Sequence, residues 1–128
     1  VQKTVQVASG YTIVPGTFYI NDVVVRNNNG VSEIYAAVGL SGNRDTASTL
    51  FGGEDYGLYK STDGGENWKK LDIYIENSTR PIQPIDLEIS PVDNSVWVSS
   101  TRDFNGNGGG GVWQSDDSGN NFTKKISS

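Results

Sequence analysis

Two aspartates at corresponding positions are the first residues in this chain that could do chemistry. Asp22 and Asp86 each lie near the start of an expected strand, in two segments with a similar order of apolar residues. Glycoside hydrolysis requires such a pair of carboxylates, one acting as the acid and the other as the base or nucleophile. The alternative is that an aspartate repeated at a repeated position is a structural residue of the turn or the strand entry. Both interpretations stay open at this stage.

A second candidate site is the segment Asp103-Phe104-Asn105-Gly106-Asn107-Gly108. Its alternating oxygen-bearing side chains match the start of a calcium-binding loop, so Asp103, Asn105 and Asn107 are candidate calcium ligands. Such a loop ends in a bidentate glutamate at its twelfth position, where this chain has Gln114. A glycine-rich hairpin loop is therefore the competing interpretation, and no other cofactor is expected.

The aromatic residues divide into a loop group and a strand group. Phe51, Tyr56 and Phe104 lie in expected loops, where they are candidates for stacking on a glycan or a protein partner. These residues belong to two long connections, residues 40–56 and 102–110. Binding sites of repeat proteins are often formed by insertions on one face, although both connections could also be solvated hairpin loops without a ligand. Four aromatic residues in expected strands are predicted to face the interior instead: Tyr35, Tyr59, Trp97 and Trp113.

The composition excludes several classes of function. The 128 residues include no His, Cys or Met, which excludes imidazole and thiol mechanisms and most transition-metal sites within this sequence. The net charge is −5, whereas nucleic-acid-binding proteins usually carry a basic surface. No apolar stretch approaches the roughly 20 residues of a membrane span. A first residue Val1, in place of an initiator Met, suggests a processed or excised piece.

A repeated pattern says more about the fold than any single residue does. The segment Ser61-Thr62-Asp63-Gly64-Gly65-Glu66-Asn67-Trp68 returns as Ser115-Asp116-Asp117-Ser118-Gly119-Asn120-Asn121-Phe122. Both read Ser-x-Asp-x-Gly-x-x-aromatic, and the second starts 54 positions after the first, at 115 against 61. Self-similarity with a period near 50 is typical of repeat architectures.

The chemistry of this pattern is that of a sealed turn. The aspartate is suited to accept hydrogen bonds from downstream backbone N–H groups, and the glycine supplies the positive φ that such turns need. The closing aromatic residue can fold over the turn. We therefore expect a structural role for its defining residues: Ser61, Asp63, Gly65, Trp68, Ser115, Asp117, Gly119 and Phe122.

The pattern resembles the Asp-box, or BNR repeat, of sialidases, xyloglucan-type endoglucanases, Vps10-type sorting receptors and photosystem assembly factors. The first copy matches at every defining position, and the second has Phe122 where tryptophan is more usual. The resemblance covers about residues 18–128 and implies a β-propeller, in which Asp22 and Asp86 would lie on the innermost strands that line the central channel. It does not imply one function, because the family spans hydrolases, receptors and scaffolds.

The strand pattern predicts an all-β fold built from two four-stranded Asp-box blades of a propeller, with a compact two-sheet β-sandwich as the alternative. Expected strands cover residues 20–25, 33–38 and 57–61 in the first unit and 84–89, 95–100 and 111–115 in the second, with fourth strands beginning at Trp68 and Phe122. Residues 1–17 are a lead-in and a possible edge strand of a preceding blade, 18–80 form blade one and 81–128 form blade two.

Two hypotheses for function remain. The chain is either a secreted or cell-surface propeller portion that binds glycan or protein, or part of a secreted glycoside hydrolase with most catalytic groups outside this segment. We favour the binding module for the segment itself. Two blades leave open sheet faces, so we expect further blades, supplied by a longer parent chain or by self-association.

Overall fold

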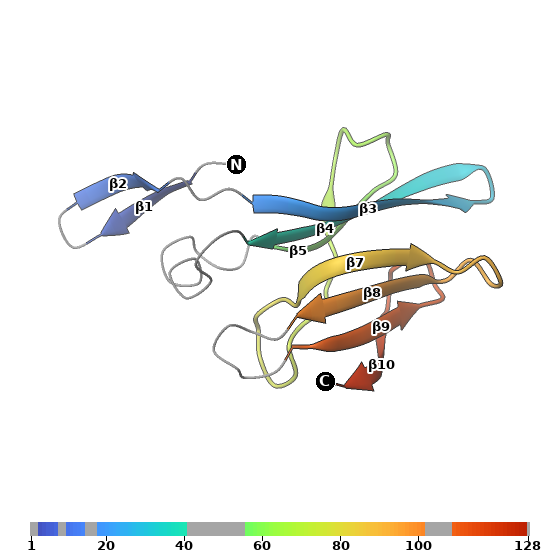
Figure 1. The fold of residues 1–128 in the computed structure, drawn as a ribbon. Coiled ribbons are helices and arrows are strands. Elements are labelled where there is room, and N and C mark those ends of the chain that lie inside the picture. Colours follow the sequence, from blue (N-terminus) through green and yellow to red (C-terminus); the bar gives the residue numbers. More distant parts are fainter. Residues whose placement is uncertain (1–2, 8–9, 15–17, 41–55, 102–108, 128) are drawn as a thin grey trace.

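The computed structural model describes residues 3–7, 10–14, 18–40, 56–101 and 109–127. All regular structure in these residues is β-strand, which confirms the all-β prediction. The strands form one two-stranded and two four-stranded antiparallel sheets (Figure 1). The two-sheet arrangement is therefore shown, and a closed ring of blades stays a prediction.

The first four-stranded sheet follows the chain order and contains β3 (Phe18–Asn28), β4 (Val31–Leu40), β5 (Gly57–Ser61) and β6 (Lys69–Lys70). A two-residue Asn29-Gly30 turn with φ of 51° and 92° joins β3 to β4. Asn-Gly favours this turn because both residues tolerate positive φ, and the turn's twist matches that of the flanking strands.

The second four-stranded sheet repeats this order with β7 (Gln83–Ile89), β8 (Val96–Thr101), β9 (Gly111–Ser115) and β10 (Thr123–Ser127). The register of the first strand pair shifts between Ile20 and Asp22 in one sheet and between Pro84 and Asp86 in the other. The two sheets are thus copies of one pairing pattern, irregularity included.

The lead-in forms a hairpin of β1 (Lys3–Val7) and β2 (Gly10–Val14), which pair with each other in a separate two-stranded sheet. Neither strand adds an edge to the four-stranded sheets, and Figure 1 shows the hairpin beyond the start of β3. Within the described residues, the lead-in is therefore a hairpin of its own.

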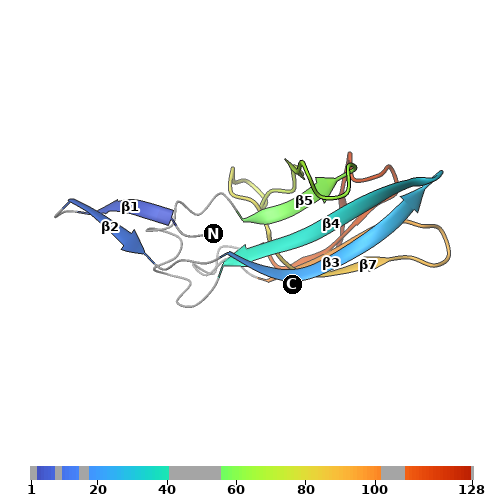
Figure 2. The ribbon, with the colours of Figure 1, turned by 90° about the horizontal axis from the view of Figure 1, so that it is seen from above.

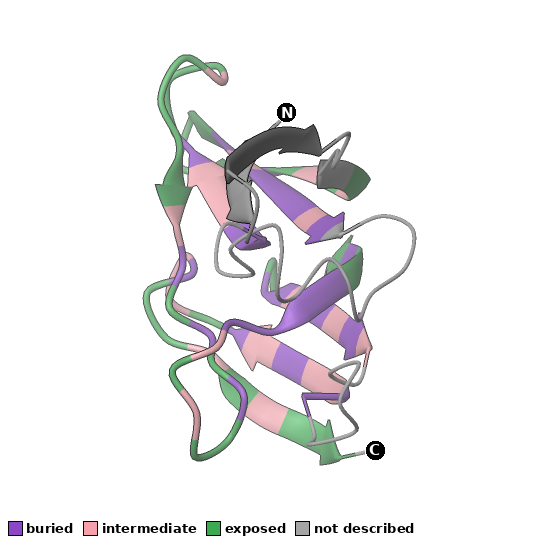
Figure 3. Cartoon of the chain, turned by 90° about the vertical axis from the view of Figure 1, so that its left-hand side faces the viewer, coloured by how far each residue is buried: buried purple, intermediate pink, exposed green. Residues whose placement is uncertain are grey.

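The two four-stranded sheets pack face to face, with β7 alongside β3 and β4 (Figures 1 and 2). Tyr35 and Leu58 of the first sheet meet Leu87, Val98 and Trp113 of the second in one buried apolar cluster. Buried residues alternate with half-buried ones along β8, as a strand with one buried face requires, whereas Tyr35, Ala36 and Ala37 of β4 are all buried (Figure 3).

The two sheets pack head to tail: the face that the first sheet buries and the face that the second sheet buries are opposite faces of the repeating unit. Tyr35 corresponds in the repeat to Trp97, and Tyr59 corresponds to Trp113. Tyr35 and Trp113 are buried between the sheets, whereas Tyr59 and Trp97 lie on the outer faces and are half-buried. The prediction that all four aromatic residues lie in the interior is therefore right for two of them in this structure. Opposite faces of the repeating unit meet at the joint between the sheets.

The segment between the sheets is part of the core. Leu71, Ile73 and Ile75 are buried and alternate with exposed residues, as in a strand with one covered face. The backbone N–H of Ile82 donates to the carbonyl of Ile73 (3.0 Å), which closes the segment on itself. The apolar side chains of this connection are part of the buried cluster between the sheets.

Candidate functional site

The first box is a closed ring of short-range hydrogen bonds. The Ser61 hydroxyl donates to Asp63 Oδ1 (2.8 Å) and accepts from the backbone N–H of Gly65 (2.9 Å). Both carboxylate oxygens of Asp63 accept from Asn67, from its backbone N–H (2.9 Å) and its side-chain amide (2.8 Å). The indole N–H of Trp68 donates to the Gly65 carbonyl (2.8 Å), so Trp68 completes the turn and β6 begins one residue later than predicted.

The second box repeats these bonds at the equivalent atoms. Ser115 donates to Asp117 Oδ1 (2.7 Å), and the Gly119 N–H donates to the Ser115 hydroxyl (2.9 Å). Asn121 donates to both oxygens of Asp117, at 2.9 and 2.8 Å. The ring of Phe122 has no N–H group, so it cannot make the hydrogen bond that the indole of Trp68 makes. As in the first unit, the next strand, β10, begins one residue after the aromatic residue, at Thr123.

Both box aspartates are held ionised by these bonds. The N–H groups of Asn67 and the hydroxyl of Ser61 lower the pKa of Asp63 to about 2, and Asn121 and Ser115 do the same for Asp117. A carboxylate that accepts several hydrogen bonds in the folded state loses them on protonation. These two groups therefore stabilise the fold fully above their unfolded pKa near 4, and that contribution is lost as the pH falls through about 2.

We expect the double variant Asp63→Asn and Asp117→Asn to weaken the acid sensitivity of the fold. The melting temperature of the unmodified chain should fall steeply between about pH 4 and pH 2, while that of the variant falls less over the same window. Glu66→Gln together with Asp116→Asn, which removes one exposed carboxylate from each box turn, is the control for net charge. Parallel curves for the double variant and the unmodified chain would contradict this role of the boxes.

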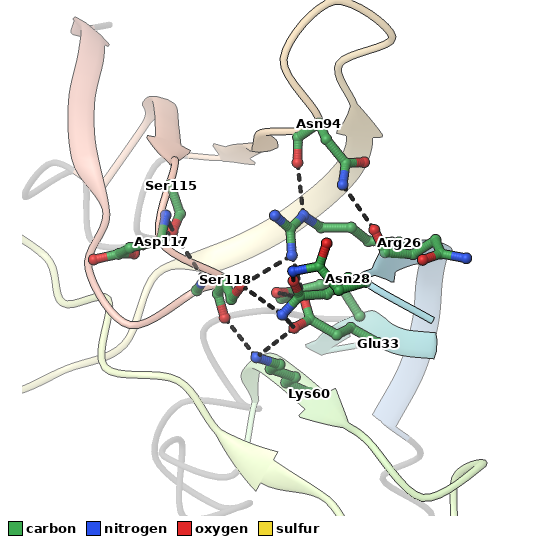
Figure 4. A network of polar contacts seen from close by, with 12 residues as sticks. Arg26, Asn28, Glu33, Lys60, Asn94, Ser115, Asp117 and Ser118 are labelled. Carbon is green, nitrogen blue, oxygen red and sulfur yellow. Dashed lines mark hydrogen bonds and ion pairs between the residues drawn. The ribbon is translucent and has the colours of Figure 1, made fainter. Parts of the chain in front are cut away.

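A buried polar joint connects the second box to the first sheet (Figure 4). Arg26 of β3 donates through Nε to the Asn94 carbonyl (2.6 Å) and through Nη1 to the Ser118 hydroxyl (2.9 Å). Lys60 of β5 donates to the Ser118 carbonyl (2.6 Å). Glu33 lies between the two cations, 2.9 Å from Arg26 Nη1 and 3.3 Å from Lys60 Nζ. Two cations of one sheet thus hold a box turn of the other.

Glu33 is the centre of this joint. Its burial raises the pKa of its carboxyl, but hydrogen bonds from Tyr35, Arg26 and Asn28 and the charge of Lys60 outweigh that effect and leave the pKa below its usual value. Burial and the hydrogen bond to Glu33 in turn raise the pKa of the Tyr35 hydroxyl, which donates at 2.8 Å. The Glu33 carboxylate is therefore ionised, hydrogen-bonded and paired with cations, which is the condition for a buried charge to be tolerated.

The two aspartates proposed as a carboxylate pair have different surroundings. Asp22 accepts the backbone N–H of Val23 (2.9 Å) and, across the joint, that of Leu87 (2.8 Å). It therefore connects the edge strands of the two sheets. Asp86 is exposed on the outer face of the second sheet. A carboxylate occupied by two backbone amides is poorly suited to act as a nucleophile or a base, which favours the structural interpretation of Asp22.

A hollow of about 300 Å³ lies beside the first box, at the lower end of the range for small-molecule pockets. Its aromatic wall is Trp68, which is 43% exposed, and Asn120 of the second box contributes from the other sheet. The remaining lining residues are Lys60, Thr62, Asp63, Asn67, Lys69 and Leu71. An exposed indole among amide, hydroxyl and ammonium groups is a surface on which a polar ring can stack.

The other candidate residues are placed as follows. Tyr56 has no exposed surface, so it lies in the interior and does not present a stacking surface, contrary to the expectation for a loop residue. Phe51, Phe104 and the proposed calcium ligands Asp103, Asn105 and Asn107 lie outside the described residues. Among the residues that the structure does describe, no group of acidic side chains is arranged to hold a metal ion.

The part of the chain described here also contains no helix long and apolar enough to cross a membrane. A scan of the sequence against models of known protein families finds no match, and searches of curated proteins and of solved structures find none either.

Proposed function

We propose that this chain is part of an extracellular Asp-box propeller and serves as a binding or scaffold module for glycan or protein. The observation that supports the fold is the head-to-tail joint, in which each sheet offers the next one the opposite face of the same unit. Such a joint can be repeated without limit, which is how blades follow one another around a propeller. The two boxes add the turn chemistry of the family that the sequence resembles.

A role in binding is favoured over catalysis because these acidic residues already make structural hydrogen bonds and ion pairs. The box aspartates bind turn amides, Glu33 binds two cations, and Asp22 binds backbone amides of both sheets. Each of these carboxylates serves the architecture. We therefore expect the chain not to hydrolyse aryl glycosides, and turnover that Asp86→Asn abolishes would favour the hydrolase alternative.

The hollow beside Trp68 is the place where we propose that a glycan binds. Sugar rings present apolar faces that stack on aromatic rings and hydroxyls that pair with amide and ammonium groups. The indole N–H is already satisfied by the Gly65 carbonyl, which fixes the orientation of the ring (2.8 Å). A fixed, exposed ring loses little conformational freedom when a ligand stacks on it.

A glycan array probed with the unmodified chain should therefore identify a ligand, and Trp68→Ala should weaken its binding about tenfold or more, the equivalent of about 1.4 kcal/mol. Trp68→Phe, which keeps an aromatic face, should retain more of the affinity. Titration calorimetry on the best array ligand measures both changes, and thermal melts establish that the variants are folded.

Tyr74→Ala provides the matched control, because Tyr74 is exposed to a similar extent (47%) and is not among the residues that line the hollow. Equal losses for Trp68→Ala and Tyr74→Ala, or no glycan binding at all, would place the binding function elsewhere, and a protein partner would then be the remaining candidate.

A further inference from the structure

Among the described residues, the outer face of the first sheet is apolar and its β3 edge is exposed. Ile20, Val23 and Val25 of β3 point to this side and are 58, 49 and 60% exposed. The register places Val38, Ala36 and Ile34 of β4 beside them in the same order, and Tyr59 of β5 beside Ala36. Ala36 is buried, and the other three are half-buried. Monomeric proteins rarely expose so continuous an apolar face, and such a face commonly marks an interaction site.

The repeat identifies what should cover this face. Val23, Ala36 and Tyr59 form a row across the first sheet, and Leu87, Val98 and Trp113 form the corresponding row across the second. The second row is buried at the joint, with Leu87 3% exposed where Val23 is 49% exposed. The β3 edge of this surface is therefore exposed in the first sheet, whereas the corresponding β7 edge is covered in the second.

The complementary surface is also present and open. The first sheet meets its neighbour through the row Val24, Tyr35 and Lys60, and the corresponding row of the second sheet is Glu88, Trp97 and Gln114. This row lies on the outer face of the second sheet, where Glu88 is exposed. Trp97 donates to the Ser95 hydroxyl (2.9 Å) and Gln114 donates to it too (3.1 Å), which copies the arrangement of Tyr35 and Lys60 around Glu33.

The edge strands offer a matching contact. At the joint, Asp22 accepts the backbone N–H of Leu87 across the two sheets (2.8 Å). The corresponding pair at a second joint is Asp86 and the backbone N–H of Val23, which in the separate chain donates to its neighbour Asp22 (2.9 Å). Asp86 is exposed, so in a second joint its carboxylate can share this N–H with Asp22 or replace Asp22 as its acceptor.

We propose that a second copy of this chain covers the apolar face, with the outer face of its second sheet on the outer face of the first sheet of its neighbour. The contact repeats the joint seen within the chain and is heterologous, so it closes into a ring when the rotation fits. Since propellers typically close with about four to eight blades, two to four copies would complete one. This inference concerns assembly and does not depend on the glycan site.

The joint between copies should be weaker than the joint within the chain. Arg26, Glu33 and Lys60 correspond to Ser90, Ser95 and Gln114, so the second sheet has no cation at the two positions that hold the box turn in the first joint. Gly64 takes the place of Ser118 in that box and offers no hydroxyl. Dilution should therefore separate the copies while each chain stays folded.

Sedimentation velocity from low micromolar to sub-millimolar concentration tests the proposal on the unmodified chain. We expect a discrete species of two to four chains at high concentration that dissociates to a folded monomer on dilution. Val112 lies on the outer face of the second sheet, in one row with Asp86 and Ser99. Val23→Glu on the first sheet and Val112→Glu on the second should each abolish association, because every contact between copies needs both faces. Val92→Glu is the matched control, because Val92 is 93% exposed in the turn between β7 and β8 and should leave assembly unchanged.

Mixing the two blocked variants provides the decisive measurement. Each retains the face that the other has lost, so Val23→Glu and Val112→Glu chains should form a mixed pair, detected by labelling one of them. A chain that is monomeric at every concentration would overturn the proposal and leave further blades of a longer protein as the occupant. A Val23→Glu variant that assembles normally, or blocked variants that do not combine, would overturn it as well.

Discussion

Replacing Glu33 with alanine should lower the free energy of unfolding by about 3 to 5 kcal/mol, because the change leaves Arg26 and Lys60 largely buried without their carboxylate. It also leaves the buried Tyr35 hydroxyl without its acceptor. Urea unfolding followed by tryptophan fluorescence measures the loss, with Glu33→Gln as the variant that keeps the size of the side chain and removes only its charge.

A double variant separates the charge from the packing. Removing one member of a buried ion pair leaves an uncompensated charge, whereas replacing both with apolar residues of similar volume is often close to neutral. Arg26→Met together with Glu33→Leu should therefore be less destabilising than the sum of the two single changes. Additive losses would mean that the two side chains contribute by packing alone.

The boxes and most strands could be predicted because their determinants are local. The hydrogen bonds of Asp63 join residues no more than four positions apart, and β3 and β4 are indicated by short runs of β-branched and aromatic residues on either side of an Asn-Gly turn. The strands after the boxes were predicted one residue too early, since Trp68 belongs to the turn that its indole closes.

The polar joint was not predicted, because it depends on which sheet faces meet. Arg26 and Ser118 are 92 residues apart, and nothing in either local sequence brings them together. One signal was available: Arg26 and Glu33 are of opposite charge and face each other across one hairpin, next to Val24 and Tyr35, which point to the same side. Two charges at such positions indicate a buried ion pair.

The burial of the strand aromatic residues was predicted correctly for two of the four, because it too depends on which sheet faces meet. Alternation gives the face of a sheet on which a side chain lies, but not whether another sheet covers that face. In a head-to-tail joint, corresponding residues of the two units have opposite surroundings, so Tyr35 is buried while Trp97 is half-buried. Two units alone leave one copy of each face open.

Gly119→Ala should destabilise the fold by about 2 to 5 kcal/mol, since it adds the cost of a left-handed alanine to that of overpacking. Gly119 has a φ of 82°, and a Cβ there would lie 3.1 Å from Cε1 of Tyr35 and 3.2 Å from Cδ1 of Leu71. The glycine therefore allows the second box to approach the core of the first sheet. Thermal and urea unfolding of the variant measure the loss.

Gly65→Ala is the matched control, because Gly65 is the corresponding residue of the first box, with a φ of 92°. A Cβ there would meet only the Trp68 ring, at 3.5 Å, so we expect a loss of about 1 to 2 kcal/mol from the backbone conformation alone. The difference between the two variants measures the close contact at the joint. Equal losses would mean that the box turn, and not its contact with Tyr35, requires the glycine. If the copies assemble as we propose, the first box becomes a joint as well, and Gly65→Ala should also weaken that assembly.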